Sequence, residues 1–192
     1  MNNNSSYNKN AHRIEPIILK GVIIPANRIR PDGSESHPRN FSGKVIPPYN
    51  KNGERNFAII VDPEQVDIDD LISKGWNIRQ GAGREDDPDF VPNYYLRIKV
   101  KFHPEDSDLA RLNPRVIEVS SKGELQMDER NIGDLDNAEI IKANMTISGR
   151  WSESQTYVGV SAYLKKMVVR VNDEDDMSDL MEGIMDDDND EE

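Results

Sequence analysis

Cations and apolar residues alternate along residues 94–102, where residue type and spacing could support binding chemistry. Successive side chains of a β-strand point to opposite faces. One predicted face is apolar or aromatic and carries Tyr94, Leu96, Ile98, Val100 and Phe102. The opposite predicted face carries Tyr95, Arg97, Lys99 and Lys101. Three neighbouring cations repel one another unless water screens them or an anion lies across them. The pattern therefore predicts a strand that packs a core with one face and meets a polyanion with the other.

Aromatic rings and cations also occur together in several other short segments. Proteins that bind single-stranded nucleic acid use both, because cations neutralise phosphates and rings stack on bases. The further candidates for DNA contact are Arg39, Phe41, Lys44, Tyr49, Lys51, Arg55, Trp76, Arg79, Arg150, Trp151, Tyr163 and Lys165. The alternative is that each ring packs in the core and each cation is merely solvated. That alternative is favoured for Phe57 and Phe102, and it stays open for Trp76 and Trp151.

The acidic residues are concentrated at the C-terminal end of the sequence. Residues 172–192 hold 12 Asp and Glu and no Lys or Arg. The other 24 acidic residues match the 24 Lys and Arg, so the net charge of −12 belongs to this tail. A tethered polyanion can compete with DNA for a cationic surface and, once displaced, bind partner proteins. The tail residues expected to meet such partners are Asp186, Asp187, Asp188, Asp190, Glu191 and Glu192.

Motifs for catalysis or cofactor binding are absent from the sequence. There is no cysteine, the three histidines are scattered, and neither a Gly-x-Ser-x-Gly elbow nor a Walker loop occurs. We therefore expect no catalytic residue, no cofactor and no metal. The acids of residues 85–89 could in principle hold Mg²⁺. Contiguous acids in a loop are more often solvated, which makes a metal-dependent nuclease the weakest hypothesis.

The apolar patterning predicts a mainly β protein with one or two short helices. The expected strands are 15–24, 55–61, 94–102, 114–120, 139–151 and 157–171, and the expected helices are 63–75 and 128–138. Gly21 and Gly149 are interpreted as strand bends, and Asp32-Gly33 and Asn52-Gly53 as tight turns. This order fits a small Greek-key barrel or sandwich better than a parallel α/β sheet. We expect residues 1–14 to be a disordered arm, 15–171 one domain and 172–192 a disordered acidic tail.

Membrane and secretion signals are also missing from the sequence. No stretch approaches the ~20 apolar residues of a membrane-spanning helix. The first residues are rich in Asn and Ser and carry no apolar signal segment. We therefore expect a soluble intracellular protein with no membrane partner.

Several segments together resemble a family of bacteriophage single-stranded DNA-binding proteins. They are Arg39-Asn40-Phe41-Ser42-Gly43-Lys44, Tyr49-Asn50, Gly53-Glu54-Arg55-Asn56-Phe57, Gly75-Trp76-Asn77-Ile78 and Ala162-Tyr163-Leu164-Lys165. The resemblance spans about residues 15–171. It implies an OB-fold barrel that coats single-stranded DNA during phage replication or recombination in the bacterial host cytoplasm. It also implies an acidic tail that recruits replication proteins. The sequence departs from the family pattern in two places: the tail finishes on Glu191-Glu192, where many bacterial relatives finish on a Phe, and residues 25–38 have no clear counterpart.

Three hypotheses about function follow from the sequence. The first is a sequence-independent single-stranded DNA-binding protein, which could form a homo-oligomer. The second is an acidic chaperone or scaffold that binds basic proteins through its tail and uses a β-rich body for assembly. The third is the nuclease described above. Deletion of residues 172–192 separates the first two, because it should tighten DNA binding in one case and abolish function in the other.

Overall fold

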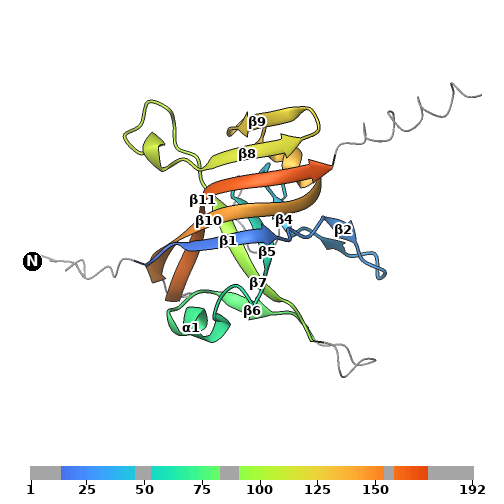
Figure 1. Cartoon of the computed structure of the whole chain (residues 1–192), viewed down its shortest axis with the longest axis vertical. Helices are drawn as coiled ribbons and strands as arrows, with labels where there is room; N and C mark the ends of the chain where they lie inside the picture. The colour runs from blue at the N-terminus through green and yellow to red at the C-terminus, as the bar shows by residue number, and fades with distance from the viewer. Residues whose placement is uncertain (1–13, 46–52, 83–90, 154–157, 173–192) are drawn as a thin grey trace, which may run out of the picture.

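The computed structural model describes residues 14–45, 53–82, 91–153 and 158–172. Most of the secondary structure in these ranges is β, with a single α-helix (Figure 1). The strands are β1 (Ile17–Val22), β2 (Arg28–Ile29), β3 (Glu35–Ser36), β4 (Arg39–Asn40), β5 (Arg55–Val61), β6 (Ile78–Gln80), β7 (Tyr94–Val100), β8 (Arg115–Ser120), β9 (Gly123–Met127), β10 (Glu139–Glu153) and β11 (Val158–Asn172). The helices are α1 (Ile68–Ser73) and the 3₁₀ turns η1 (Ala110–Leu112) and η2 (Ile132–Asp136).

Five of the strands form a closed ring. β1 pairs antiparallel with β10, and β10 pairs antiparallel with β11. β11 then pairs parallel with β7, and β7 pairs antiparallel with β5. The ring closes where the Ile60 N–H donates to the Ile23 carbonyl at 3.0 Å. Numbered along the chain, these five strands are neighbours in the order 1-2-3-5-4-1, the Greek-key order of an OB-like barrel. The expected fold class is therefore confirmed.

The long strand β11 carries the sheet beyond the barrel. Ala162 and Tyr163 pair with β7, whereas the segment from Lys166 to Arg170 pairs parallel with β8. β9 then pairs with the far edge of β8. Figure 1 is viewed onto this extended sheet, with β9, β8, β11, β10 and β1 side by side and β5 and β7 behind them. The barrel therefore presents two outer faces, one on β5 and β7 and the other on β1, β10, β11 and β8.

The interior of the barrel contains one continuous cluster of buried apolar side chains. On β7, Leu96, Ile98 and Val100 are all buried, so the predicted alternation is confirmed for residues 94–100, and the strand ends two residues earlier than expected. The expected buried run at residues 58–61 is only half correct. Ile59 and Val61 are buried, while the residues that alternate with them face outward.

The register of β11 changes along its length. Val160, Ala162 and Leu164 are buried in the first part, as predicted, and Met167 and Val169 are buried in the second. A shift in the pairing with β10 accounts for this change of phase, because one extra residue at a bulge moves the following side chains to the opposite face. The outer side of β11 therefore carries outward-facing side chains on both sides of the bulge, from the part paired with β7 to the part paired with β8.

The helix α1 begins later than the sequence predicted. Asp67 is its N-cap, and its carboxylate accepts the Asp70 N–H at 2.9 Å. The expected start after Asp62 is wrong, because Asp62 accepts the Glu64 N–H in a preceding turn. The second expected helix, at 128–138, is the 3₁₀ turn η2. No helix in the described ranges is long and apolar enough to span a membrane.

The two glycines interpreted as bends have different roles. Gly21 has a φ of +63° and lies at a register shift of β1, so a bulge there is confirmed. The predicted bend at Gly149 is wrong, because pairing with β11 runs through this residue without a shift. A Cβ at Gly149 would lie 3.0 Å from the ring of Trp76 and 2.8 Å from Val160. Gly149 therefore makes room for a buried tryptophan.

Candidate nucleic-acid interface

Arg39 is buried and serves the fold. Its side chain donates to four backbone carbonyls, those of Ile24 at 2.7 Å, Pro25 at 2.9 Å, Ala138 at 2.5 Å and Leu135 at 3.5 Å. The residue is 3% exposed, and burial lowers the pKa of its guanidinium while the carboxylate of Asp136 opposes that shift. The expectation that Arg39 contacts phosphate is therefore wrong in this structure, since its donors point into the protein.

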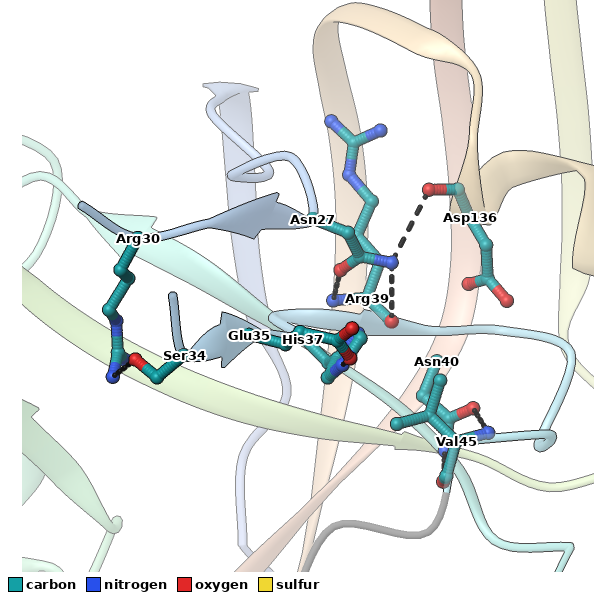
Figure 2. Close-up of polar contacts among 9 residues, drawn as sticks. All are labelled: Asn27, Arg30, Ser34, Glu35, His37, Arg39, Asn40, Val45 and Asp136. Carbon is teal, nitrogen blue, oxygen red and sulfur yellow. Dashed lines mark hydrogen bonds and ion pairs between the residues drawn. The ribbon is translucent and has the colours of Figure 1, made fainter. Parts of the chain in front are cut away.

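Hydrogen bonds also hold the residues around Arg39 in place. Asn27 and Arg39 exchange two hydrogen bonds of 2.9 and 3.0 Å, and the side chain of Asn40 bonds both the N–H and the carbonyl of Val45 (Figure 2). The Asp136 carboxylate accepts the N–H groups of Phe41 at 2.6 Å and of the next residue at 3.0 Å. These contacts fix the chain that leads from β4 toward β5.

Phe41 belongs to the core. It is fully buried and stacks on Phe57, with ring centroids 4.6 Å apart and an interplanar angle of 25°. The prediction that Phe41 stacks on a base is therefore wrong, because the ring already has a partner inside the barrel. The Arg-Asn-Phe-Ser-Gly segment, which carried much of the family resemblance, is thus an architectural motif.

The outer side of β7 brings several of the predicted DNA-contacting residues together. Tyr95, Arg97 and Lys99 alternate with the buried residues of the strand and lie on its outer side. Arg79 on β6 is paired with Tyr95, and Tyr163 on β11 is paired with Lys99. We call this set of five residues the β7 face. It combines three cations with two rings. Three of these residues come from β7, and strand pairing brings the other two, Arg79 and Tyr163, from distant parts of the chain.

The cations of the β7 face are only partly compensated. Arg97 donates to the Asn56 amide oxygen at 2.7 Å, and the ammonium of Lys99 lies 2.9 Å from a Glu54 carboxylate oxygen. Burial lowers the pKa of Arg97, the neighbouring cation of Arg79 lowers it further, and the carboxylate of Glu54 opposes both shifts. An Arg side chain stays protonated in proteins, so the repulsion between Arg79 and Arg97 is present in the free protein.

Two functional partners were missed from the sequence. Asn56 is 2% exposed and positions the guanidinium of Arg97, while Glu54 pairs with Lys99. Both residues lie in the Gly53–Phe57 segment, but their relation to β7 depends on strand register. Pairing of Asn56 with Lys99 across β5 and β7 is the signal that identifies them.

The other predicted cations within the described ranges do not belong to the β7 face. Lys44, Lys101 and Lys165 are exposed, and Arg150 is exposed on the outer side of β10, opposite Ser161. Arg55 is paired with Val100 and forms an ion pair with Glu129 at 3.0 Å. Its guanidinium carbon lies 5.9 Å from the centroid of the Phe102 ring. Arg55 is therefore engaged away from the β7 face.

The two tryptophans differ in accessibility. Trp76 is 3% exposed, so the prediction that it stacks on a base is wrong and the core alternative holds. Trp151 is 49% exposed and packs beside Gly75, where a Cβ would lie 2.8 Å from the ring. Trp151 is thus available for DNA contact.

Some predicted residues lie outside the described ranges. They are Tyr49, Lys51 and the six tail acids Asp186, Asp187, Asp188, Asp190, Glu191 and Glu192. The acids of residues 85–89, the candidate Mg²⁺ ligands, all fall in another such gap. Within the described ranges, no group of three or more His, Asp or Glu could hold a metal ion.

This protein is an OB-like barrel with cations and rings on the outer side of β7, an arrangement that is typical of barrels that bind nucleic acids. Comparison with protein families narrows this class: the family described as "Putative phage ssDNA-binding domain" matches residues 20–190. The chain belongs to this family, which confirms the resemblance found in the sequence. The family is one of DNA-binding rather than catalytic proteins, in agreement with the expectation of a non-enzymatic function.

Solved structures and curated proteins add little information about this protein. A solved structure, the single-stranded DNA-binding protein from bacteriophage Enc34, is similar over 83% of this chain and 81% of that chain, with 12% sequence identity and a TM-score of 0.39. This likeness is too distant to carry an argument about the site. No curated protein matches the chain.

Proposed function

We propose that this protein binds single-stranded DNA independently of sequence and coats it during phage DNA replication or recombination in the bacterial host cytoplasm. The observation that carries the proposal is the β7 face, where three cations and two rings lie on one outer side of an OB-like barrel. Membership of the phage single-stranded DNA-binding family supports it.

The β7 face can hold a single strand through two kinds of contact. Arg79, Arg97 and Lys99 would neutralise phosphates, releasing condensed counterions and making affinity fall with salt. Tyr95 and Tyr163 would stack on bases, and stacking is worth about 1–3 kcal/mol per base. Every base has a π-face, so this mode of binding tolerates all sequences.

The partners of the β7 cations would change on binding. Asn56 is neutral and holds Arg97 in place without cancelling its charge. Glu54 neutralises Lys99 in the free protein, and a phosphate would compete with that carboxylate. The face is thus ordered before binding and keeps at least two cations, Arg79 and Arg97, available for phosphate.

Preference for single strands follows from the rings. A ring can stack on a base only when the base has left its duplex neighbours, and unstacking a duplex costs a few kcal/mol per step. Duplex DNA would therefore engage the cations of the β7 face without the two tyrosines. We expect weaker and more salt-sensitive binding to duplex than to an unpaired strand.

The acidic tail, residues 172–192, would regulate this binding. It holds 12 carboxylates on a short tether, so its effective concentration near the barrel is high. DNA that displaces the tail would free it to recruit replication or recombination proteins. Removing the tail should therefore tighten DNA binding, most clearly at low salt.

The experiment is a fluorescence titration of dye-labelled oligo-dT and of a matched duplex with the full chain and with a chain ending at residue 171. We expect strong single-strand preference, tighter binding without the tail, and quenching of the half-exposed Trp151 instead of the buried Trp76. Absence of binding at low salt, with and without the tail, would contradict the proposal and favour a scaffold that binds basic proteins. Unchanged or weaker binding by the shortened chain would contradict only the competitive role of the tail.

A further inference from the structure

A second cationic surface lies on the other outer face of the barrel. It is formed by Lys20 on β1, Lys142 on β10, Lys166 and Arg170 on β11, and Arg115 on β8, and we call it the β10–β11 face. All five side chains are exposed, and none forms an ion pair with a residue in the described ranges. The strands that carry it face the viewer in Figure 1.

Like charges are directly opposed on this face. Lys142 is paired with Arg170 across β10 and β11, and Lys166 is paired with Arg115 across β11 and β8. Directly opposed like charges destabilise a sheet. An anion that bridges the two pairs would remove this cost, so the arrangement favours an anionic ligand over simple solvation.

The surroundings of these cations leave their charge largely uncompensated. The strand positions between them are occupied by neutral residues, namely Thr146, Asn144, Val168 and Ile117. Among the residues that the structure describes, two carboxylates lie at the far end of the face. Glu124 is on β9, and Glu139 accepts a hydrogen bond from the Asn172 amide at 3.0 Å. Among these residues there is no aromatic ring, so the face can hold phosphates but cannot stack bases.

The outer side of β11 joins the two cationic faces. Tyr163 belongs to the β7 face, and exposed Lys165, Lys166 and Arg170 follow it along the same strand. At about 3.3 Å per residue, roughly 23 Å of strand separates Tyr163 from Arg170, which is a few nucleotides of extended DNA. A strand of DNA that leaves the β7 face in this direction therefore meets Lys165, Lys166 and Arg170 in turn.

We propose that the β10–β11 face is a second phosphate-binding surface, on which single-stranded DNA continues after it leaves the β7 face. The proposal rests on the proposed function of the β7 face and extends it to a second part of the barrel. The β7 face stacks bases and neutralises phosphates, whereas the β10–β11 face contributes charge alone. Short oligonucleotides occupy the first face, and only longer ones reach the second.

The test is the salt dependence of binding by the full chain to oligo-dT of two lengths, about 8 nucleotides, which lies within the usual range of one OB barrel, and about 35 nucleotides, which exceeds it. The variant K142Q/K166Q/R170Q is compared with K74Q/R111Q/R130Q, which removes the same charge from exposed residues elsewhere. For the long oligonucleotide we expect the slope of log K against log salt to become shallower by about 2, at roughly 0.7 per lost contact. The short oligonucleotide should bind both variants alike.

A second variant, K20Q/R115Q, removes the flanking cations and keeps the test valid if the triple variant unfolds. It should make the slope of log K against log salt shallower for the long oligonucleotide alone. Slopes equal to those of the control variant would overturn the proposal, provided that the wild type binds both lengths. Tighter binding by the triple variant would also overturn it, because the face would then be a docking site of the acidic tail. Failure of the wild type to bind either length would instead contradict the proposed function itself.

Discussion

Arginine has opposite roles in two regions of this barrel, the β7 face and the site around Arg39. Arg39 is 3% exposed and donates to carbonyls of Ile24, Pro25 and Ala138, which come from two distant parts of the chain. Arg97 donates to the neutral amide of Asn56 and has another arginine, Arg79, beside it. All three nitrogens of the first guanidinium donate to backbone carbonyls, whereas the second is held by a neutral amide and only partly compensated by the nearby carboxylate of Glu54.

The difference shows what decides the role of a cation. A buried charge persists only when it is fully hydrogen-bonded, and this bonding removes its donors from any ligand. A cation next to another cation on an open sheet keeps its attraction for anions. The partners of a cationic side chain therefore distinguish architecture from binding, although both regions contain similar residues in the sequence.

The largest expected effect of a substitution is on the Arg39 site. Arg39→Gln leaves several buried carbonyls without a donor, and the free energy of unfolding should fall by about 3 kcal/mol or more. Urea denaturation followed by circular dichroism measures this change. Arg30→Gln, at an exposed arginine of the β2–β3 hairpin, is the control and should change stability little. Equal stabilities of the two variants would show that the Arg39 contacts do not hold the fold.

A smaller effect is expected on the β7 face, and on affinity instead of stability. Tyr95→Ala removes a ring that is paired with Arg79 on the outer side of the sheet, so single-strand binding should weaken by about 1–3 kcal/mol. Tyr95→Phe keeps the ring and should retain most of the affinity. Fluorescence polarisation with oligo-dT separates the two variants. If Tyr95→Phe lost as much affinity as Tyr95→Ala, the hydroxyl would matter and stacking would not explain binding.

The smallest expected effect has the opposite sign to that at Arg39. Lys142→Gln removes one member of a like-charged pair with Arg170, so the free protein should gain about 0.2–1 kcal/mol of stability at low salt. Thermal melting measures the gain, which should shrink as salt rises. Lys74→Gln is the matched control, because Lys74 pairs with Asp70 at 2.6 Å and its loss should not stabilise the protein. A loss of stability on replacing Lys142 would contradict the repulsion inferred for the β10–β11 face.

The sequence predicted the β7 face because its signal is local. Alternation along one strand places Tyr95, Arg97 and Lys99 together whatever surrounds them. The burial of Arg39 could not be predicted in the same way, since its acceptors lie about 15 and 99 residues away. Strand register could not be predicted either, because it depends on residues far apart in the sequence, as the pairing of Asn56 with Lys99 shows.

Other errors have similarly specific causes. The strand β9 was not predicted because four of its five residues are exposed, which leaves no apolar alternation to detect. The helix start was placed too early because Asp62 and Asp67 both suit an N-cap, and only the hydrogen bond from Asp70 shows which one serves. Gly149 was interpreted as a bend because the Trp76 ring that requires it is far away in the sequence.

The most direct test of DNA binding by the β7 face is the salt dependence of the double variant R97Q/K99Q. Titrations with a short oligo-dT at several salt concentrations compare it with K74Q/R111Q, which loses the same charge at exposed residues elsewhere. If the β7 face neutralises two phosphates with these residues, the slope of log K against log salt should become shallower by about 1.4 for R97Q/K99Q alone. Equal slopes and affinities for the two double variants would contradict the assignment and place the DNA on another surface.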